Sequence, residues 1–372
     1  MINIGIECES IEKKEWGIGR IVSRLLQDIS SRPQLKKDFR FHLFFKTSIP
    51  NFDYLNDDIF VKKIIKLPYQ RSTSFSLYYY LFLPIYLWFY KVDVMFFPNY
   101  MLPHLFFGTS IVHMTNDIYF EMKSKSQKFR HKIAYRIFTG WATKHATRLL
   151  TWSYSAKNDI SKLFHIASDK IEVAYLGLDL PNTFDSPNIN GDYIFYLGQA
   201  FPRRHLKETI LAFEQISNDY PKLSLIASGV DKYKPPIIKK MANELNRKLG
   251  REAIKYYDFI KDDSQIAHLY KHAKLFVYIS DKESFGLPPL EALSFGSIPV
   301  VADNDLSHEL FGDNAFFVSK LHDVDSIAVA FKEGLTNESK RIEIAKSAFS
   351  LKSKFSWENY TNIFLQICRE LA

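Results

Sequence analysis

The chain has 372 residues, 47% of them hydrophobic, and a formal net charge of +8 at pH 7. This length predicts two or three domains, and the hydrophobic content is typical of a globular protein. Cys8 and Cys368 are the only cysteines, so we expect no disulfide framework and a reducing cytoplasm. Met1 leads directly into a strand-like run, so no secretory signal is expected.

The positive charge is concentrated in the first half of the chain. Residues 1–180 contain 25 Lys and Arg against 16 Asp and Glu, whereas the remaining residues contain 24 and 25. A basic half can face membrane phospholipid or nucleic acid, or it can simply keep the surface soluble. No nucleic-acid-binding motif accompanies the charge, so we expect no nucleic-acid partner.

Strand-like and helix-like segments alternate through this first half. Between Ile18 and Ile29, apolar residues recur on one helical face,. Such alternation predicts a parallel sheet covered on both faces by helices. The strand-like runs are Ile2–Glu7, Phe39–Phe45, Ile59–Leu67, Asp93–Pro98, Thr109–Met114 and Arg148–Ser153.

Two segments of the first half bear on membrane association. Ser74–Lys91 is strongly aromatic, but it is too short and too rich in tyrosine for a spanning helix, and Pro84 interrupts it,. We favour a helix packed under the sheet over an interfacial anchor for this segment. Lys123–Arg136 mixes cations with Phe129 and Tyr135, which suits phospholipid headgroups, although a solvated helix is the simpler interpretation.

A second alternating series follows a linker-like stretch. Residues Gly177–Gly191 contain proline, glycine and asparagine without periodicity,. We therefore predict two doubly wound α/β domains, 1–180 and 181–355, with a cleft at the carboxyl ends of their strands. The strand-like runs of the second domain are Tyr193–Gly198, Leu223–Ser228, Ile254–Ile260, Leu275–Ser280, Ile298–Val301 and Ala315–Val318.

The most informative stretch, from Glu283 to Val301, indicates a strand end, a loop, a helix and a further strand. Gly286 can adopt backbone angles that other residues avoid, so we expect a helix to begin near Leu287, with free N–H groups that bind an anion. Glu283 and Glu291 would face one cleft. Carboxylates beside an anion site indicate a ligand such as a nucleotide sugar. A solvated helix start carrying favourable acids is the alternative.

This stretch resembles the E-x7-E motif of retaining glycosyltransferases of the GT-B fold, family GT4. The run GLPPLEAL is most similar to the mannosyltransferase-like branch of that family. The resemblance covers nearly the whole chain in the family's order. It implies two Rossmann-like domains facing a central cleft, the first (1–180) for the acceptor and the second (181–355) for the donor. It also implies that a final helix, 356–372, crosses back to the first domain.

The resemblance assigns a diphosphate-binding role to a basic turn. The run YLGQAFPRRHLKETILAF is similar to the family's strand, Pro-Arg-Lys-Asn-Leu turn and helix. Arg203 and Arg204 stand where an Arg-Lys pair is usual, and His205 replaces the usual asparagine. The two cations, with N–H groups near Gly286 and Leu287, would stabilise the leaving diphosphate. Arginine in place of lysine keeps the charge but changes its geometry from a point to a fork.

The same resemblance gives the acidic loop its roles. Glu291 would accept hydrogen bonds from the ribose hydroxyls of the donor. Glu283 would bind hydroxyls of the donor sugar, or support positive charge at the anomeric carbon. Ser284 and Phe285, between Glu283 and Gly286, are assigned to donor binding.

In the first domain, EWGIGR is similar to the family's glycine loop, where Gly17 and Gly19 would let the backbone approach a diphosphate or acceptor. The run IVHMTNDIYF corresponds to a strand end that commonly carries His-Asp in the family. Here it has Asn116 and Asp117, so asparagine replaces histidine. Asp117 is the preferred contact to the reacting sugar, and His113 is interpreted as a packed strand histidine.

The resemblance implies a retaining transfer of a hexose, without metal or cofactor, to a glycan or lipid-linked acceptor in surface polysaccharide or lipopolysaccharide assembly. GDP-mannose is the first donor expected; UDP-hexose, UDP-N-acetylhexosamine and dTDP-rhamnose stay open. The location would be cytoplasmic, with peripheral contact to an anionic membrane. A GT-B epimerase or phosphorylase and a non-catalytic nucleotide-sugar-binding protein are the other classes. The retained Glu283, Arg203 and Glu291 argue against lost catalysis, and no pyridoxal-phosphate lysine motif is visible.

Overall fold

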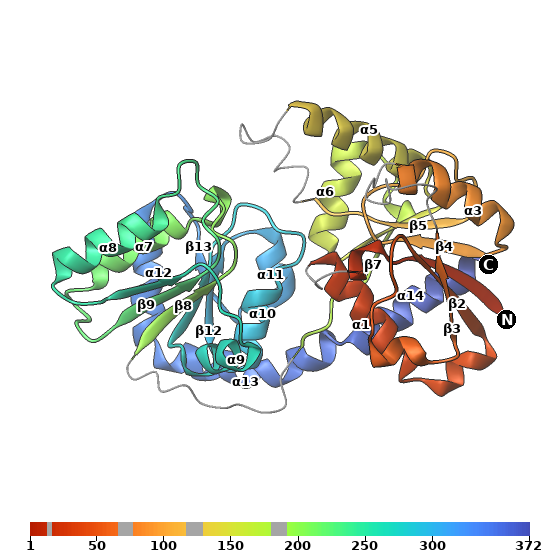
Figure 1. Ribbon diagram of the computed structural model, residues 1–372. Coiled ribbons are helices and arrows are strands. Elements are labelled where there is room, and N and C mark those ends of the chain that lie inside the picture. The colour runs from red at the N-terminus through yellow and green to blue at the C-terminus, as the bar shows by residue number, and fades with distance from the viewer. Residues whose placement is uncertain (13–16, 66–76, 117–128, 180–191) are drawn as a thin grey trace. The chain divides into compact units, whose positions relative to one another are not determined.

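The computed structural model describes residues 1–12, 17–65, 77–116, 129–179 and 192–372 (Figure 1). The chain divides into two compact units. Unit 1 comprises Met1–Gly177 and Phe355–Ala372, and unit 2 comprises Leu178–Lys354. Most of the stretch interpreted as a linker, 180–191, lies outside the described residues.

Unit 1 is built on a parallel sheet of seven strands in the order β3-β2-β1-β4-β5-β6-β7. Its central strands are almost continuously apolar and fully buried, as expected for a sheet covered on both faces,. The short β7 was not predicted, because three residues are too few to show a period. The strands are β1 (Ile2–Glu7), β2 (Phe39–Phe45), β3 (Phe60–Ile64), β4 (Val94–Phe97), β5 (Ser110–His113), β6 (Arg148–Thr151) and β7 (Ile171–Val173).

Helices cover both faces of this sheet (Figure 1). The first, α1, buries the apolar face that its sequence period predicts. Apart from short 3-10 turns, the described helices of unit 1 are α1 (Ile18–Ser30), η4 (Tyr78–Phe82, a π-helical turn), α3 (Leu83–Phe89), α5 (Phe129–His145), α6 (Tyr154–Phe164) and α14 (Trp357–Leu371).

The aromatic segment in η4 and α3 has two different faces. Tyr78, Tyr79 and Leu83 are fully buried in the core of unit 1, so the predicted packing under the sheet is found. Trp88 and Phe89 at the end of α3 are 60% and 81% exposed. Across the described ranges, no helix combines the length and apolar character needed to cross a membrane.

The C-terminal helix α14 packs within unit 1. Ser356 caps the helix by accepting a hydrogen bond from the backbone N–H of Asn359. The ring of Phe364 is fully buried, and its centroid lies 5.0 Å from that of Phe96 on β4. Gly177 allows the chain to pass α14 closely, because a Cβ there would lie 2.4 Å from the backbone nitrogen of Trp357.

Unit 2 repeats the doubly wound design with six parallel strands in the order β10-β9-β8-β11-β12-β13. The strands are β8 (Tyr193–Leu197), β9 (Ser224–Ser228), β10 (Ile254–Tyr257), β11 (Leu275–Tyr278), β12 (Ile298–Ala302) and β13 (Phe316–Val318). A short 3-10 turn, η6 (Pro202–Arg204), carries the two arginines. The other helices are α7 (Leu206–Ile216), α8 (Ile238–Leu249), α9 (Asp263–His272), α10 (Leu287–Ser294), α11 (Asp305–Phe311), α12 (Val324–Thr336) and α13 (Glu338–Lys354).

Strand order positions the candidate site in unit 2. Strands β8 and β11 are neighbours although two strands separate them in the sequence. The chain order therefore reverses between them, and the loops that follow them lie side by side. Such a switch point is where doubly wound sheets bind ligands. The predicted fold class, two doubly wound parallel α/β domains, is confirmed.

Candidate functional site

A pocket that is open to solvent lies at the carboxyl ends of β11 and β12. Its walls combine the acidic loop with apolar residues of α10 and α11, and they include Tyr278, Ser280, Glu283, Phe285, Gly286, Pro289, Asn304 and Leu310.

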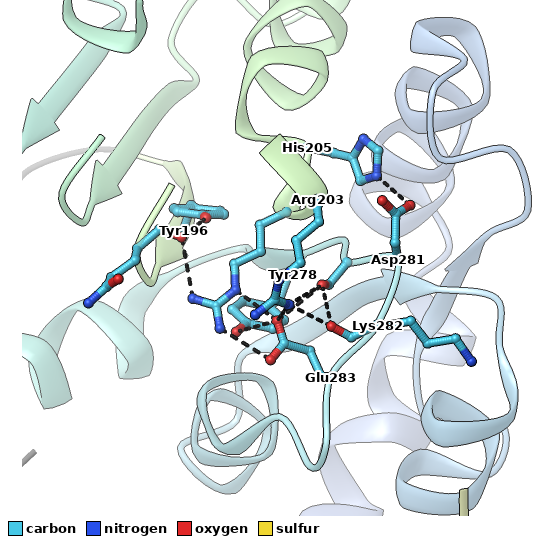
Figure 2. A network of polar contacts seen from close by, with 10 residues as sticks. Tyr196, Arg203, His205, Tyr278, Asp281, Lys282 and Glu283 are labelled. Atoms are coloured by element: carbon cyan, nitrogen blue, oxygen red, sulfur yellow. Dashed lines mark hydrogen bonds and ion pairs between the residues drawn. The ribbon is translucent and has the colours of Figure 1, made fainter. Parts of the chain in front are cut away.

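Arg203 and Arg204 enclose the carboxylate of Glu283 at this pocket (Figure 2). Arg203 donates through Nη1 to Oε1 of Glu283 at 2.6 Å. Arg204 forms a bidentate pair, from Nε to Oε1 at 2.7 Å and from Nη2 to Oε2 at 3.1 Å. Ser280 and Tyr278 donate their hydroxyls to the same Oε1 at 3.0 and 3.3 Å. The two arginines thus contact the predicted catalytic glutamate directly.

These pairs determine the charge of the cluster. Burial raises the pKa of Glu283, but the guanidinium groups of Arg204 and Arg203 outweigh it and hold the pKa at about 2. Glu283 is therefore a carboxylate at neutral pH. With two guanidinium groups around one carboxylate, the cluster keeps one net positive charge for an anionic ligand.

Arg204 is also positioned by its apolar surroundings. Its guanidinium carbon lies 5.2 Å from the ring centroid of Tyr278 and 5.7 Å from that of Phe201, within the range of cation–π contacts. Gly198, directly after β8, has a φ of 146°. A Cβ at this position would lie 3.2 Å from Nη1 of Arg204, so a larger residue would displace the guanidinium.

Helix α10 begins at Leu287, as predicted, with Gly286 as its left-handed N-cap at φ 92°. Four backbone N–H groups are free at a regular helix start. Here Pro288 and Pro289 occupy two of those positions, so only the N–H groups of Gly286 and Leu287 remain. Fewer N–H groups are therefore available to an anion here than at a regular helix start. The arginines must supply more of the anion binding.

Glu291 lies on α10 but is not part of the pocket wall. Its side chain is buried, and its Oε2 accepts a hydrogen bond from the hydroxyl of Tyr270 on α9 at 3.1 Å. Glu283 thus lies in the loop and Glu291 on the helix that follows it, and the two glutamates have different hydrogen-bond partners. Ser284 and Phe285 are both buried between them, and Phe285 lines the pocket.

The predicted glycine loop of unit 1 is described only in part, because residues 13–16 lie outside the described residues. Gly17 is the N-cap of α1 with a φ of 56°. A Cβ on Gly19 would lie 2.4 Å from the carbonyl oxygen of Ser10. Gly19 therefore lets α1 approach the Ser10 backbone, which is a structural reason for this glycine that the sequence did not reveal.

The other candidates of unit 1 lie at the end of β5. His113 is buried, and its Nδ1 donates a hydrogen bond to the carbonyl oxygen of Pro98 at 3.1 Å. Its ring stacks on that of Trp152, with centroids 4.1 Å apart. Burial lowers the pKa of His113 to about 3, so it is neutral, in agreement with a packed histidine. Asn116 is fully buried and donates to Asp159 at 2.8 Å. Asp117 lies outside the described residues.

Some residues of the site were not singled out from the sequence. Tyr278 and Ser280 contact Glu283, and Asp281 accepts a hydrogen bond from Nε2 of His205 at 2.8 Å. All three follow or end the strand-like run before the acidic loop. Their position at the end of a predicted strand could have identified them, because the carboxyl ends of parallel strands form the ligand-binding edge.

Comparison with known proteins identifies this region. Residues 182–350 match the family model described as glycosyl transferases group 1. The O-antigen chain mannosyltransferase B of Escherichia coli is 29% identical over 232 residues, 58% of this chain and 58% of that protein. The O-antigen chain mannosyltransferase RfbU of Salmonella typhimurium is 24% identical over 221 residues, 59% of each.

The chain also has the fold that the sequence predicted. The crystal structure of WaaG, a glycosyltransferase involved in lipopolysaccharide biosynthesis, aligns with a TM-score of 0.68 over 99% of both chains at 15% identity. The likeness shows that the two α/β units form the GT-B fold. Each sequence alignment covers under two thirds of the mannosyltransferase it matches.

Proposed function

We propose that this protein is a retaining glycosyltransferase that moves a hexose from a nucleotide sugar to a glycan or lipid-linked acceptor. GDP-mannose is the first donor to test, because the two relatives described above are O-antigen mannosyltransferases. Surface polysaccharide assembly is then the process it serves, at a cytoplasmic location. The observation that carries the proposal is the pairing of Arg203 and Arg204 with Glu283 at a pocket within the family-matched region.

The cluster has the charges that a leaving diphosphate requires. Guanidinium forks match phosphate oxygens, and preorganised positive charge stabilises the negative charge that develops on the leaving group. When a diphosphate binds, the arginines would share their donors between it and Glu283. The remaining N–H groups of Gly286 and Leu287 would add to this contact.

The reaction we propose forms the new bond on the face from which the diphosphate departs. The bond between the anomeric carbon and the phosphate oxygen breaks, and the acceptor oxygen bonds to the same carbon. The acceptor proton passes to the departing phosphate oxygen. Glu283, ionised beside the pocket, would support positive charge at the anomeric carbon or bind sugar hydroxyls. Glu291 would bind the ribose.

A thermal-shift panel identifies the donor. The unliganded chain is heated with GDP, UDP and dTDP, and then with GDP-mannose, UDP-glucose, UDP-N-acetylglucosamine and dTDP-rhamnose. A ligand at 100 times its dissociation constant stabilises the native state by about 2.7 kcal/mol. We expect the largest shift with GDP and GDP-mannose. A shift with uridine ligands alone would reassign the donor, and the absence of any shift would contradict nucleotide-sugar binding.

Product analysis then separates an enzyme from a binding protein. The chain is incubated with the donor that stabilises it and with a mannose-terminated oligosaccharide or its lipid-linked form. The anomeric configuration of the new bond is read by NMR. An α-linked product from the α-linked donor is expected for retention, an inverted product would contradict the mechanism, and tight binding without any transfer would favour a non-catalytic protein.

A further inference from the structure

A group of three metal-ligating side chains includes the residue that directly follows the arginine pair. His205, Glu208 and His322 bring one ligand atom each to within 4.8 Å of one another. His205 directly follows Arg204, Glu208 lies in the first turn of α7, and His322 lies between β13 and α12. In Figure 2, His205 points away from the Glu283 cluster and toward Asp281.

Two buried atoms of this group have no hydrogen-bond partner. The His205 side chain is 1% exposed and that of Glu208 is 18% exposed. Nδ1 of His205 and Oε2 of Glu208 are the unpartnered atoms, and they lie 3.6 Å from each other. Buried polar atoms are normally satisfied, so a pair that faces one point calls for an explanation.

The distances are close to those of a zinc site. Ligands at about 2.0–2.2 Å from a tetrahedral zinc ion are separated by about 3.3–3.5 Å from one another. The gap between His205 and Glu208 is already within a few tenths of an ångström of this value. The rings of His205 and His322 have centroids 4.5 Å apart and are nearly perpendicular. His322 is exposed, so a change of its side-chain torsions can close the remaining distance.

Asp281 supplies the outer support that such sites use. Ligating histidines usually donate their second ring N–H to a carboxylate, which orients the ring and fixes its tautomer. Nε2 of His205 is 2.8 Å from Oδ1 of Asp281. Donation through Nε2 leaves the lone pair of Nδ1 directed toward Glu208 and His322.

We propose that His205, Glu208 and His322 bind a divalent transition-metal ion of the zinc type. Two imidazole nitrogens and one carboxylate oxygen are a donor set that zinc accepts, with water as the fourth ligand. The ion would join the turn that carries Arg203 and Arg204 to the loop between β13 and α12. Its role is therefore to position the arginine turn, and it does not take part in the proposed reaction.

A proton on His205 is the alternative to a metal ion at this position. Burial disfavours a charged His205 ring, but the neighbouring carboxylates of Asp281 and Glu208 outweigh burial and raise the pKa of His205 to about 9. A protonated ring between two carboxylates would explain the group without a metal. Direct metal binding separates the two explanations.

The test uses the untagged full chain, treated with a chelator and dialysed, because a histidine tag would itself bind zinc. Zinc chloride is titrated by calorimetry, and Co²⁺ is added to a second sample to report coordination through its visible spectrum. The informative variant is His322→Asn, which removes an exposed ligand and leaves the pair of His205 with Asp281 intact. Asp281→Ala is expected to lower the affinity about 10–100-fold.

Two matched controls locate the ion. His308 is an exposed histidine that is 2.7 Å from Asp303 but is not part of a three-residue ligand group among the described residues. His272 lies one helical turn from His268, with ring centroids 4.3 Å apart, and such a pair can also bind zinc. His308→Asn and His272→Asn should both keep wild-type affinity for the ion.

We expect the wild type to bind one zinc ion and to gain thermal stability from it. His322→Asn should lose at least tenfold in affinity and most of the thermal gain. The four-coordinate Co²⁺ spectrum should disappear with it. Equal zinc binding by the wild type and His322→Asn, loss of binding in His272→Asn instead, or no binding by the wild type would each overturn the proposal. Binding of the nucleotide sugar is measured in a separate experiment. Failure of the zinc proposal can then be distinguished from failure of the proposed function.

Discussion

At the scale of single residues, the main finding is that one carboxylate, Glu283, pairs with both Arg203 and Arg204. Arg203 and Arg204 are paired with a carboxylate that is only 12% exposed. Removing both arginines would leave a buried charge without a partner, which costs about 3–5 kcal/mol. A double alanine variant would therefore confound loss of catalysis with loss of stability, and single substitutions are the cleaner test.

Arg204→Ala should lower turnover by about 10²–10³-fold, the effect of losing one well-placed transition-state donor. The fold should persist, because Glu283 keeps its hydrogen bonds from Arg203 and Ser280. Steady-state kinetics and circular dichroism measure the two effects. Lys207→Ala, which removes an exposed cation three positions further along the chain, is the control and should retain full activity.

The two glutamates should differ in what they affect. Glu291→Ala should weaken binding of the matching nucleoside diphosphate, because a ribose contact exists before the reaction. Glu283→Ala should keep that affinity and lose transfer. Calorimetry and transfer assays read the two properties, and Tyr270→Phe controls for the hydrogen bond that Glu291 accepts. The roles are reversed if only Glu283→Ala abolishes nucleotide binding.

Glu7, at the end of β1, makes stability depend on pH. Its carboxyl is fully buried, and burial raises its pKa from 4.5 to about 8. Between these values the folded chain holds a proton that the unfolded chain has released. Stability should therefore fall as pH rises from about 4.5 to about 8, and change no further above that.

Glu7→Gln removes this titration and keeps a side-chain oxygen for the N–H of Glu9 and the hydroxyl of Tyr78. The variant should match the wild type near pH 5. At pH 8 it should be more stable, by on the order of a few kcal/mol. Chemical denaturation across this range measures the difference. Parallel curves for the two proteins at every pH would contradict the assignment.

At the scale of elements, the backbone conformation of the turn before α7 explains why a histidine is suitable at position 205. His205 is the N-cap of α7 and has left-handed backbone angles, φ 47° and ψ 32°. Histidine and asparagine are both enriched in this conformation among non-glycine residues. His205 therefore suits this turn, and it adds an imidazole between Asp281 and Glu208.

Helix α14 should contribute strongly to the stability of unit 1. Phe364 is fully buried against Phe96. Phe364→Ala leaves a cavity and should cost about 3–5 kcal/mol. Denaturant unfolding followed by tryptophan fluorescence measures the loss. Gln366→Ala on the exposed face of the same helix should change stability by about 0.5 kcal/mol or less, and an equal cost for both variants would show that α14 does not pack through Phe364.

At the scale of the whole molecule, membrane association stays a proposal, and unit 1 carries exposed aromatic residues through which it can be tested. Trp88, Phe89 and Phe107 are 60%, 81% and 78% exposed. Aromatic rings suit the boundary between headgroups and acyl chains. The cations expected to add attraction lie in Lys123–Arg136, of which residues 123–128 lie outside the described residues.

The triple variant Trp88→Ser, Phe89→Ser and Phe107→Ser should bind vesicles of phosphatidylserine and phosphatidylcholine less than the wild type does. Co-sedimentation at low salt measures binding, and added salt should release the wild type in part, since salt screens exposed charges beyond about 8–10 Å. Val329→Ser, at an exposed apolar position of unit 2, is the control. A wild type that does not sediment at low salt would favour a soluble acceptor.

Local patterns in the sequence determined the elements and the type of fold. Apolar runs between turn signals predicted all but one of the described strands, because burial in a parallel sheet requires such runs. Gly286 and the prolines after it predicted where α10 begins. The two glutamates and two arginines were recognisable in the sequence because they sit at fixed offsets from these turns.

Only the tertiary structure decided which of these side chains meet. Arg203 and Glu283 are 80 positions apart, and the pairing of β8 with β11 brings their loops together. The same strand order places Asp281 beside His205, and the packing of α7 and α12 places His322 there too. Periodicity reports the environment of a segment over a few residues, whereas these contacts depend on the order of strands in the sheet, which a local pattern does not encode.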